Sequence, residues 1–510
     1  MNTLSLNTDT PSGRQSVVLA VCLAALVLPL SFSGAAVGTP AIGRDLGGSG
    51  VALTWITNAF MLTFGSLLMT AGTLADRYGR KRIFVGGMIV FVIFSLLLTF
   101  AQSVWLVDLY RAGQGVGAAA ALAAGSAAMA QEFDGHARTK AFSMLGTTFG
   151  VGLAFGPIIA GWLIDQFGWR SIFATGAIVG TLALAFGIPQ LKESRDPNAT
   201  TLDWPGVITF TGALTLFTFG IIQAPESGWG SLLVIGLLVG AAALLALFIV
   251  AESRVARPML ELSLFRYPRF IGVQLLPIAT GFAYVVLLIM LPLRFVGIQG
   301  QSEVEAGLLM AALSVPIIIV PSIAVSLSQR FSAGVISGIG LLIAATGVLW
   351  LGQITPASGL LIVLPMLMIG IGAGFPWGLM DALSVTVVPK ERAGMATGIF
   401  NTTKVASEGV TLAIASAILA GLGGASIAAM VGANTGANAE AFREAGQRLA
   451  TGDLANAILI VPEVGRDVLV NSYLSAFQML TYVLATVAII AAIASFWLLS
   501  DKHRDDSVAE

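Results

Sequence analysis

The sequence predicts an all-α polytopic membrane protein, a chain whose helices cross a lipid bilayer many times. Of its 510 residues, 56% are hydrophobic and only 10% are charged, whereas soluble domains carry about 25% charged residues. The charged residues are separated by apolar runs of about 20 residues, the length that crosses a bilayer core. Basic residues also cluster in short loops beside these runs, as they do in the cytoplasmic loops of membrane proteins.

Fourteen apolar runs, bounded by Gly, Pro and charged residues, are expected to form transmembrane helices. They cover residues 16–38, 51–74, 82–102, 104–131, 139–164, 169–189, 204–223, 231–251, 269–297, 304–328, 333–352, 357–387, 394–421 and 473–500. If the N-terminus is cytoplasmic, most Lys and Arg residues of the loops fall on the cytoplasmic side. This satisfies the positive-inside rule and places both termini in the cytoplasm. The run after Arg14 is too long for a signal peptide, so it is expected to remain as the first span.

These runs divide into three parts along the chain. Residues 1–189 are expected to form an N-terminal six-helix bundle, 190–251 a cytoplasmic linker with two inserted transmembrane helices, and 252–510 a C-terminal six-helix bundle. A long outer loop, 421–472, interrupts the last part. Its middle has the apolar spacing of a helix on the membrane surface. Such a helix either closes the outer face as a solvated element or acts as a substrate lid.

The sequence contains no pattern for a metal site or an enzyme. The single cysteine, Cys22, lies in the first run, while His136 and His503 lie in a polar loop and in the tail. No His/Cys/Asp cluster, catalytic serine motif or soluble domain is present. Neither an enzyme activity nor a cofactor or metal is therefore expected, and nothing predicts a nucleic-acid partner.

Several spans carry motifs that point to one family. These are residues 72–82 between spans two and three; Arg111, Gln114, Gly115 and Gly117 in span four; Gly146, Gly150, Gly152, Gly156, Pro157, Ala160 and Gly161 in span five; 202–206, 252–258 and 264–266 beside the inserted helices; and 394–404 in span thirteen. In these motifs the chain resembles the major facilitator superfamily, and within it the fourteen-helix branch of drug:proton antiporters. The resemblance covers about residues 70 to 410 and the last helix.

The resemblance implies two six-helix bundles of major facilitator type plus two inserted helices. It also implies a secondary active exporter of small organic molecules or drugs, driven by proton antiport through alternating access in the inner (plasma) membrane. The expected partners are a small-molecule substrate, protons and the lipid bilayer, and the chain is expected to be a monomer. The alternative is a dedicated exporter of one metabolite, siderophore or self-made antibiotic, which is neutral or anionic.

The loop between spans two and three is expected to act as a conformational latch. Its predicted residues are Gly72, Asp76, Arg77, Gly79 and Arg80. Asp76 and Arg77 lie at the cytoplasmic end of span two, where a carboxylate can meet an arginine or a helix N-terminus of the opposite half. Such a pair closes the cytoplasmic face in the outward-open state and opens when substrate or protons arrive. The alternative, that basic residues only orient the chain, is the interpretation for Lys81 and Arg82.

The fifth span carries a ladder of small residues. Glycines at this spacing let helices approach closely, and Pro157 adds a kink about which the outer end can bend. The predicted gating residues are Gly146, Gly150, Gly156, Pro157 and Gly161. A pure packing role is the alternative. By the resemblance, this motif favours export over uptake.

Ionisable side chains inside the spans are the candidates for proton coupling or substrate binding, because each costs about 2.5–3.5 kcal/mol on insertion scales. Asp108 and Arg111 are three residues apart in span four and can neutralise each other. Lys404 and Glu408 share one face of span thirteen. Asp381 lies near the cytoplasmic end of span twelve. The alternatives are structural ion pairs without a function and, for Asp381, a place in the lining of the inner vestibule.

The first span departs from the pattern of the branch, which usually has Leu-Asp-x-Thr-x-x-Asn-x-Ala-Leu-Pro. Aligned on Pro40, this chain has Ser31 in place of the acid and Ala36 in place of the asparagine. Our hypothesis is that the titrating carboxylate has moved to Glu408, where the branch generally has glycine. A desolvated glutamate at this depth can take up a proton near neutral pH, and Lys404 opposes the uptake.

The sequence does not identify the substrate. Aromatic residues expected near a cavity are Trp55, Phe60, Phe149, Phe375, Trp377 and Phe400, although most aromatic residues in such spans pack against helices or lipid. Arg294, near the outer end of span nine, is expected to snorkel. Glu303 and Glu305, at the outer start of span ten, are expected to be solvated.

Overall fold

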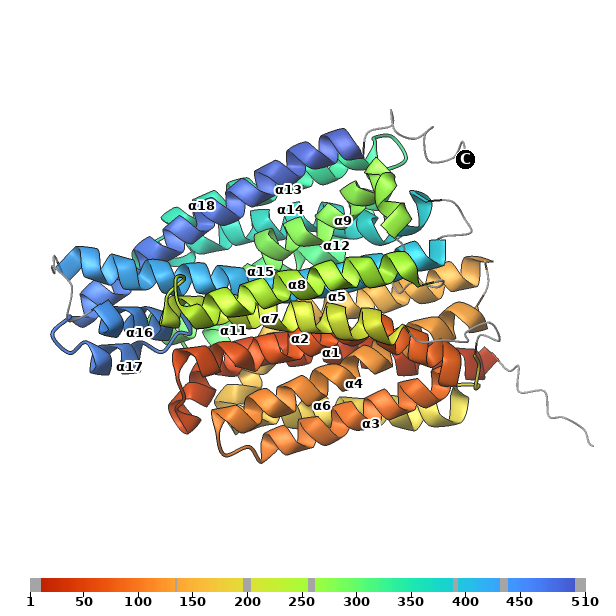
Figure 1. The fold of residues 1–510 in the computed structure, drawn as a ribbon, viewed down its shortest axis with the longest axis horizontal. Coiled ribbons are helices and arrows are strands. Elements are labelled where there is room, and N and C mark those ends of the chain that lie inside the picture. Colours follow the sequence, from red (N-terminus) through yellow and green to blue (C-terminus); the bar gives the residue numbers. More distant parts are fainter. Residues whose placement is uncertain are drawn as a thin grey trace, which may run out of the picture.

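The computed structural model describes residues 11–133, 135–195, 203–255, 262–388, 393–431 and 439–499. Residue 202 and residues 256–258 of the predicted motifs lie outside these ranges. The described chain folds into helices that run along one long axis (Figure 1). Twelve of the described helices are long and apolar enough to cross a membrane, or thirteen if α5 (Gly135–Phe167), bent by 44°, is one span. The prediction of an all-α polytopic membrane protein is confirmed.

The first group of helices comprises α1 (Pro11–Leu46), α2 (Gly50–Tyr78), α3 (Arg80–Thr99), α4 (Val104–Glu132), α5 and α6 (Arg170–Gln190). Within this group α4 packs against α2 and α3, while α1 packs against α5 and α6. Ser49 and Ser103 cap α2 and α4 by accepting hydrogen bonds from backbone N–H groups of the first turn. Gly79 separates α2 from α3 with a φ of 116°, a backbone angle that residues other than glycine rarely adopt.

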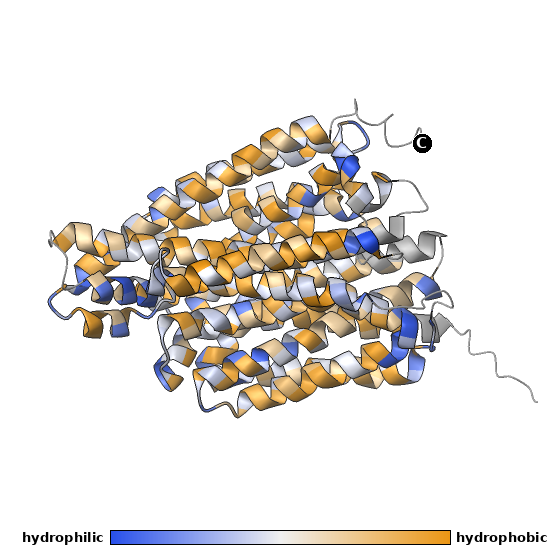
Figure 2. Ribbon diagram, in the orientation of Figure 1, coloured by the Kyte–Doolittle hydropathy of each residue, from blue (hydrophilic) through white to orange (hydrophobic). Residues whose placement is uncertain are grey.

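Two helices, α7 (Trp204–Ser227) and α8 (Leu232–Arg254), lie between the two groups along the chain, and we call them the inserted pair. They pack against each other, and α7 also contacts α2 and α15. Asp203 begins α7 by accepting a hydrogen bond of 2.9 Å from the Gly206 N–H. Figure 2 shows α8 as apolar along most of its length, and Leu232 is 88% exposed. Such a face suits contact with lipid tails.

The second group comprises η1 (Leu262–Arg266), α9 (Pro268–Thr280), η2 (Gly281–Val285), α10 (Val286–Pro292), η3 (Leu293–Ile298), α11 (Glu303–Ser314), α12 (Pro316–Leu327), α13 (Ala333–Gln353), η4 (Pro356–Ile362), α14 (Val363–Thr386), α15 (Ala393–Val431) and α18 (Arg466–Leu498). Residues 268–298 form one helical run with two wider π-helical stretches, η2 and η3. Pro277 precedes the first stretch and Pro292 the second. Because proline lacks the N–H of a regular turn, it disturbs the hydrogen bonding of the helix there.

The predicted outer-loop helix is present as α16 (Ala439–Ala450), followed by α17 (Leu454–Ile460). Both lie at one end of the long axis, on the left in Figure 1, which we call the α16 end. The opposite end, where α2 passes into α3, is called the Gly79 end. Helix α16 packs against α15 and also contacts α2, α7 and α18, so it joins both groups rather than lying free on the surface.

Candidate functional site

A small cavity lies between the two helix groups, and its free volume in this state is about 10 Å³. Its lining residues come from α1, α2, α5, η2, α14 and α15 and are Leu28, Pro29, Phe32, Phe60, Met61, Phe64, Phe149, Leu153, Val285, Trp377 and Glu408. Among these described lining residues, Glu408 alone is ionisable and all others are apolar. The volume admits about one water molecule, but the lining has the composition of a site for an apolar organic molecule, with one carboxylate as a polar anchor.

The aromatic residues expected near a cavity divide into two sets. Phe60, Phe149 and Trp377 line the cavity, as the sequence suggests. Trp55 instead packs edge-on against Phe219 of the inserted pair, with ring centroids 5.8 Å apart. The remaining two, Phe375 and Phe400, are not among its described lining residues.

Glu408 presents its carboxylate to this cavity from α15, and the residue is only 8% exposed. In the described ranges no side chain donates a hydrogen bond to this carboxylate. The sequence grouped Glu408 with Lys404, but the Lys404 ammonium is paired with Asp381 of α14, at 3.4 Å from Oδ2. Helical side chains lean toward the helix N-terminus, which directs Lys404 toward Asp381 and the Gly79 end, although its charge still acts on Glu408.

Lys404 also lies against aromatic rings. Its Nζ is 5.3 Å from the ring centroid of Trp377 and 5.9 Å from that of Phe400, distances at which a ring face attracts a cation. Trp377 in turn contacts Tyr284 of η2 edge-on, with centroids 5.7 Å apart. Lys404 therefore lies behind the Trp377 ring that lines the cavity. The carboxylate with which it pairs, that of Asp381, belongs to a side chain that is 57% exposed.

Arg111 of α4 is fully buried at the other side of the cavity wall. Its Nε donates to the Ile56 carbonyl and its Nη1 to the Ser31 hydroxyl, each at 2.9 Å. Its guanidinium lies 4.4 Å from the ring centroid of Phe60. Within the described ranges no ion pair of 4 Å or less joins Arg111 to Asp108, but the two opposite charges are close enough to attract each other, as the sequence suggests. The hydrogen bonds of the guanidinium go to oxygens of α1 and α2 and to Gln114 of its own helix.

Ser31, which takes the place of the expected acid, belongs to a buried chain of neutral groups. Besides accepting from Arg111, its hydroxyl donates to Gln114 Oε1 at 3.2 Å. Gln114 Nε2 donates to Ser95 Oγ at 2.8 Å, and that hydroxyl donates to the Phe91 carbonyl. The arrangement holds a buried positive charge with uncharged acceptors.

The predicted latch residues gather at the Gly79 end. Asp76 Oδ1 accepts hydrogen bonds from Arg80 Nε at 3.0 Å and Nη2 at 2.8 Å, and Arg80 also donates to Gln131. Arg77 lies 5.1 Å from the ring centroid of Tyr78. In the described part of the chain, no hydrogen bond or ion pair of Asp76 reaches the second group. Here Asp76 is thus bound within its own group.

The glycines of α5 fall into two classes. Toward the α16 end, a Cβ atom at Gly161 would collide with the Glu303 carbonyl of α11. In the same region Gly307 of α11 packs onto the backbone of Pro157. Toward the Gly79 end, a Cβ placed at Gly146 or Gly150 would have no atom of the described residues within 4 Å.

The remaining predicted residues of the ladder and the latch differ in the same way. A Cβ at Gly156 would collide with Ser33 of α1, so this glycine packs within the first group. A Cβ at Gly72, near the latch, would meet no atom of the described residues within 4 Å. The described glycines of α5 therefore pack tightly toward the α16 end and have free space beside them toward the Gly79 end.

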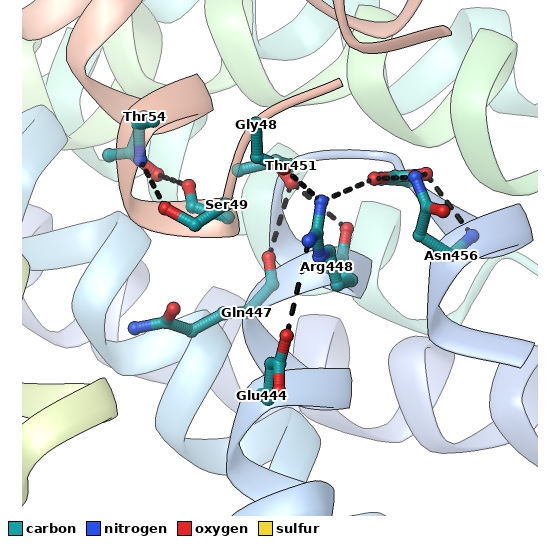
Figure 3. Close-up of polar contacts among 11 residues, drawn as sticks. Gly48, Ser49, Thr54, Glu444, Gln447, Arg448, Thr451 and Asn456 are labelled. Atoms are coloured by element: carbon teal, nitrogen blue, oxygen red, sulfur yellow. Dashed lines mark hydrogen bonds and ion pairs between the residues drawn. The ribbon is translucent and has the colours of Figure 1, made fainter. Parts of the chain in front are cut away.

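Two polar contacts that the sequence did not reveal also join the groups at the α16 end. Arg44 of α1 forms an ion pair of 2.8 Å with Glu303 of α11. The Glu303 side chain is only 14% exposed, so the expectation that it is solvated is wrong. From α16, Arg448 donates to the Gly48 carbonyl and pairs with Asp453 at 3.0 Å (Figure 3). The partners that join the groups, Arg44 with Glu303 and Arg448 with Gly48, are far apart in the sequence, which gives no signal for these contacts.

Arg294 does not snorkel as expected. It is 1% exposed, and its Nη2 donates to the Ile354 carbonyl at 2.6 Å. Its guanidinium lies 4.8 Å from the ring centroid of Phe477. The end of α13 and a ring of α18 thus take the place of water around this cation.

Comparisons with known proteins agree on one family. A model described as Major Facilitator Superfamily matches residues 21–411. The chain is 30% identical over 386 residues to the multidrug resistance protein Stp of Mycobacterium tuberculosis (strain CDC 1551 / Oshkosh), covering 75% of this chain and 72% of that protein. It is 32% identical over 406 residues to the cephamycin export protein CmcT of Amycolatopsis lactamdurans, covering 78% and 82%.

A solved structure has the same fold. It is the crystal structure of a bacterial homologue of the human lysosomal transporter Spinster, in an inward-facing and unoccupied conformation. The TM-score is 0.63 at 17% identity, and the match covers 96% of this chain and 97% of that one. At this identity the likeness concerns the fold alone.

Proposed function

Because the chain belongs to the major facilitator superfamily, a family of membrane transporters and not of enzymes, we propose that it exports small organic molecules by proton antiport. The export proceeds by alternating access across the cell's inner (plasma) membrane. The relatives are named for multidrug resistance and for cephamycin export, which supports an exported small-molecule substrate.

The proposed topology has fourteen spans with both termini in the cytoplasm. Thirteen of these spans are helices that meet the criteria of length and composition, with α5 counted as one span. The fourteenth is α4, which is 29 residues long but rich in alanine and glycine. The first and second groups are then two six-helix bundles, with the inserted pair between them. The Gly79 end, with its basic loop, faces the cytoplasm.

The observation that carries the proposal is the central cavity, which both helix groups line and in which Glu408 is the only ionisable residue among the described lining residues. A midmembrane carboxylate without a hydrogen-bonded partner can exchange a proton for a bound substrate. The contrast along α5, closed at Gly161 and open at Gly150, supports a state that is open to the cytoplasm. Rocking the groups about the cavity then gives alternating access.

The latch completes this proposal at the cytoplasmic face. In the structure Asp76 is held by Arg80 of its own group, which suits a state in which that face is open. When the face closes, Asp76 exchanges this partner for a group of the second bundle. Gly72 leaves room for the approach, and Gly79 provides the backbone turn between α2 and α3. Arg77 and Arg80 supply the positive charge with which Asp76 changes partners.

Transport in proteoliposomes under an imposed pH gradient tests the function. We expect substrate efflux to require the gradient and to release protons in wild-type protein, and Glu408→Gln to abolish the proton release. Glu226→Gln, at an exposed carboxylate of α7, is the control and should leave coupling intact. Undiminished proton coupling in Glu408→Gln protein would contradict the assignment of this carboxylate.

A dedicated exporter of one neutral or anionic product is the second candidate. Ser31 favours it, since the acid that the branch usually carries in span one is missing. The name of the cephamycin export protein also fits this reading. Efflux assays with matched cationic, neutral and anionic compounds separate the two candidates, because a dedicated exporter transports one class only.

A further inference from the structure

Two carboxylates lie on either side of a single ammonium group in the second helix group. Asp381 faces outward from α14 with a side chain that is 57% exposed, while Glu408 faces the cavity and is 8% exposed. Lys404, with a side chain that is 15% exposed, comes one helical turn before Glu408 and is paired with Asp381 at 3.4 Å. The described lining residues of the cavity include no other acid or base.

We propose that Lys404 exchanges between Asp381 and Glu408, and so acts as a tethered competitor for organic cations at the cavity carboxylate. This inference rests on the proposed function, since it assigns a specificity-determining residue to the same site. Asp381 acts as the holding partner that keeps the ammonium away while the cavity is open for loading.

The geometry allows both partners to be reached. Residues four apart on a helix have Cβ atoms about 5–6 Å from each other, and the lysine side chain is a flexible four-carbon stem that ends in a compact charge. The present pair at 3.4 Å is longer than a close ammonium–carboxylate hydrogen bond of about 2.7–2.9 Å. The ammonium is therefore held loosely enough to leave.

The surroundings of Glu408 make its interaction with a neighbouring cation strong. Its neighbours in the cavity are apolar side chains of α1, α2, α5, η2 and α14, so water does little to screen a charge there. Arg111, the nearest cation of the first group's wall, lies behind the ring of Phe60 and is already bound to oxygens of α1 and α2. The ammonium of Lys404 is thus the internal cation that can neutralise Glu408.

The proposal predicts opposite effects from two variants that break the same ion pair. Lys404→Gln removes the competitor, so an organic cation should bind more tightly to Glu408. Asp381→Asn frees the ammonium to pair with Glu408, so the same cation should bind more weakly. A purely structural ion pair gives effects in the same direction, because either variant destroys it.

The test measures equilibrium binding of tetraphenylphosphonium to the full-length protein in lipid nanodiscs, without any proton gradient. We expect binding about tenfold tighter for Lys404→Gln and about tenfold weaker for Asp381→Asn, with Lys404→Arg close to wild type. Effects of the same sign, or no binding by Lys404→Gln, overturn the proposal. Thermal unfolding checks that each variant is folded, and Lys404→Met replaces Lys404→Gln should the latter fail.

Repeating both substitutions in a Glu408→Gln background completes the test. There the two effects should vanish, because the carboxylate for which the cations compete is gone; effects that persist overturn the proposal. Failure of the proposed function can be told apart from failure of this inference, because it appears as missing proton coupling in proteoliposomes. The binding pattern can hold without that coupling.

Discussion

Arg111 donates a hydrogen bond from Nη1 to the hydroxyl of Ser31, at 2.9 Å, and so joins α4 to α1 in a region closed to solvent. Where the antiporter branch usually has an aspartate to meet a positive charge, this chain offers a neutral oxygen. The Ile56 carbonyl, the Gln114 side-chain oxygen and the rings of Phe60 and Phe173 also surround the guanidinium. A buried cation held this way depends strongly on each remaining acceptor.

Ser31→Ala should lower stability, because it removes an acceptor from the buried Arg111. We expect a loss of about 1–3 kcal/mol, the cost of leaving a buried polar group without its partner. Ser31→Asp should unfold at a higher temperature than Ser31→Ala, since a carboxylate forms the stronger, charge-assisted bond. Thermal unfolding of purified protein measures both.

Ser33→Ala is the control for these variants, because among the described residues the Ser33 hydroxyl bonds within its own helix, to the Pro29 carbonyl. It should change the unfolding temperature little. If Ser31→Ala and Ser33→Ala unfold alike, the bond between Ser31 and Arg111 contributes nothing measurable.

Gly161→Val should push the protein toward the state that is open at the α16 end. The added side chain collides with the Glu303 carbonyl, and overpacking of this kind costs about 1–3 kcal/mol. Gly150→Val is the matched variant on the same helix, where no described atom lies within 4 Å of the added Cβ. The measurement is the labelling of a cysteine at Met61, on the cavity wall, by an impermeant maleimide added outside.

In a Cys22→Ser background, the introduced cysteine is the only one in the chain. Labelling from outside should increase with Gly161→Val and stay low with Gly150→Val. Equal labelling of the two would mean that the packing of α5 against α11 does not close the outer face.

Asp76→Asn should impair transport far more than stability. Its bond with Arg80 links residues four apart on a part-exposed surface, where such pairs contribute about 0.3–0.5 kcal/mol. If Asp76 changes partners during closure, its loss costs coupling energy, and we expect about a tenfold fall in transport rate. Glu193→Gln, which loses an exposed pair with Arg82, should transport normally. A similar loss in both variants argues against a latch.

The sequence predicted elements that depend on local composition and spacing. The apolar runs became helices, and the apolar spacing of 439–449 became α16, because burying one face requires that periodicity. The direction of Lys404 also followed a general rule, the lean of helical side chains toward the N-terminus. Applying that rule to the sequence favours a partner other than Glu408.

Contacts between distant segments were not predictable in this way. Arg294 was expected to reach water, but Ile354 and Phe477, which no local pattern links to it, enclose it instead. Likewise, Arg448 and Gly48 are 400 residues apart. Such contacts arise only when the groups pack, so a single sequence without related sequences carries no record of them.

The position of α16 leads to a last prediction, since this helix belongs to the second group yet touches the first. Arg448 binds the Gly48 carbonyl (Figure 3), and a Cβ atom at position 50 would lie 2.9 Å from Cβ of Gln447. If the α16 end must open during transport, this contact has to break in every cycle. Linking the two positions covalently should therefore stop the cycle.

We expect a Gly50→Cys/Gln447→Cys pair, in the Cys22→Ser background, to form a disulfide under oxidation, because a small outward shift brings the two Cβ atoms from 2.9 Å into the range of about 3.5–4.5 Å that disulfides need. Transport should fall at least about tenfold and recover with a reducing agent. A Gly424→Cys/Arg443→Cys pair ties α16 to α15 of its own group, where a Cβ at position 424 lies 3.2 Å from the Arg443 Cα. It should leave transport unchanged. Full activity of the first pair after verified cross-linking would mean that α16 stays bound to the first group throughout, and that the substrate leaves by another route.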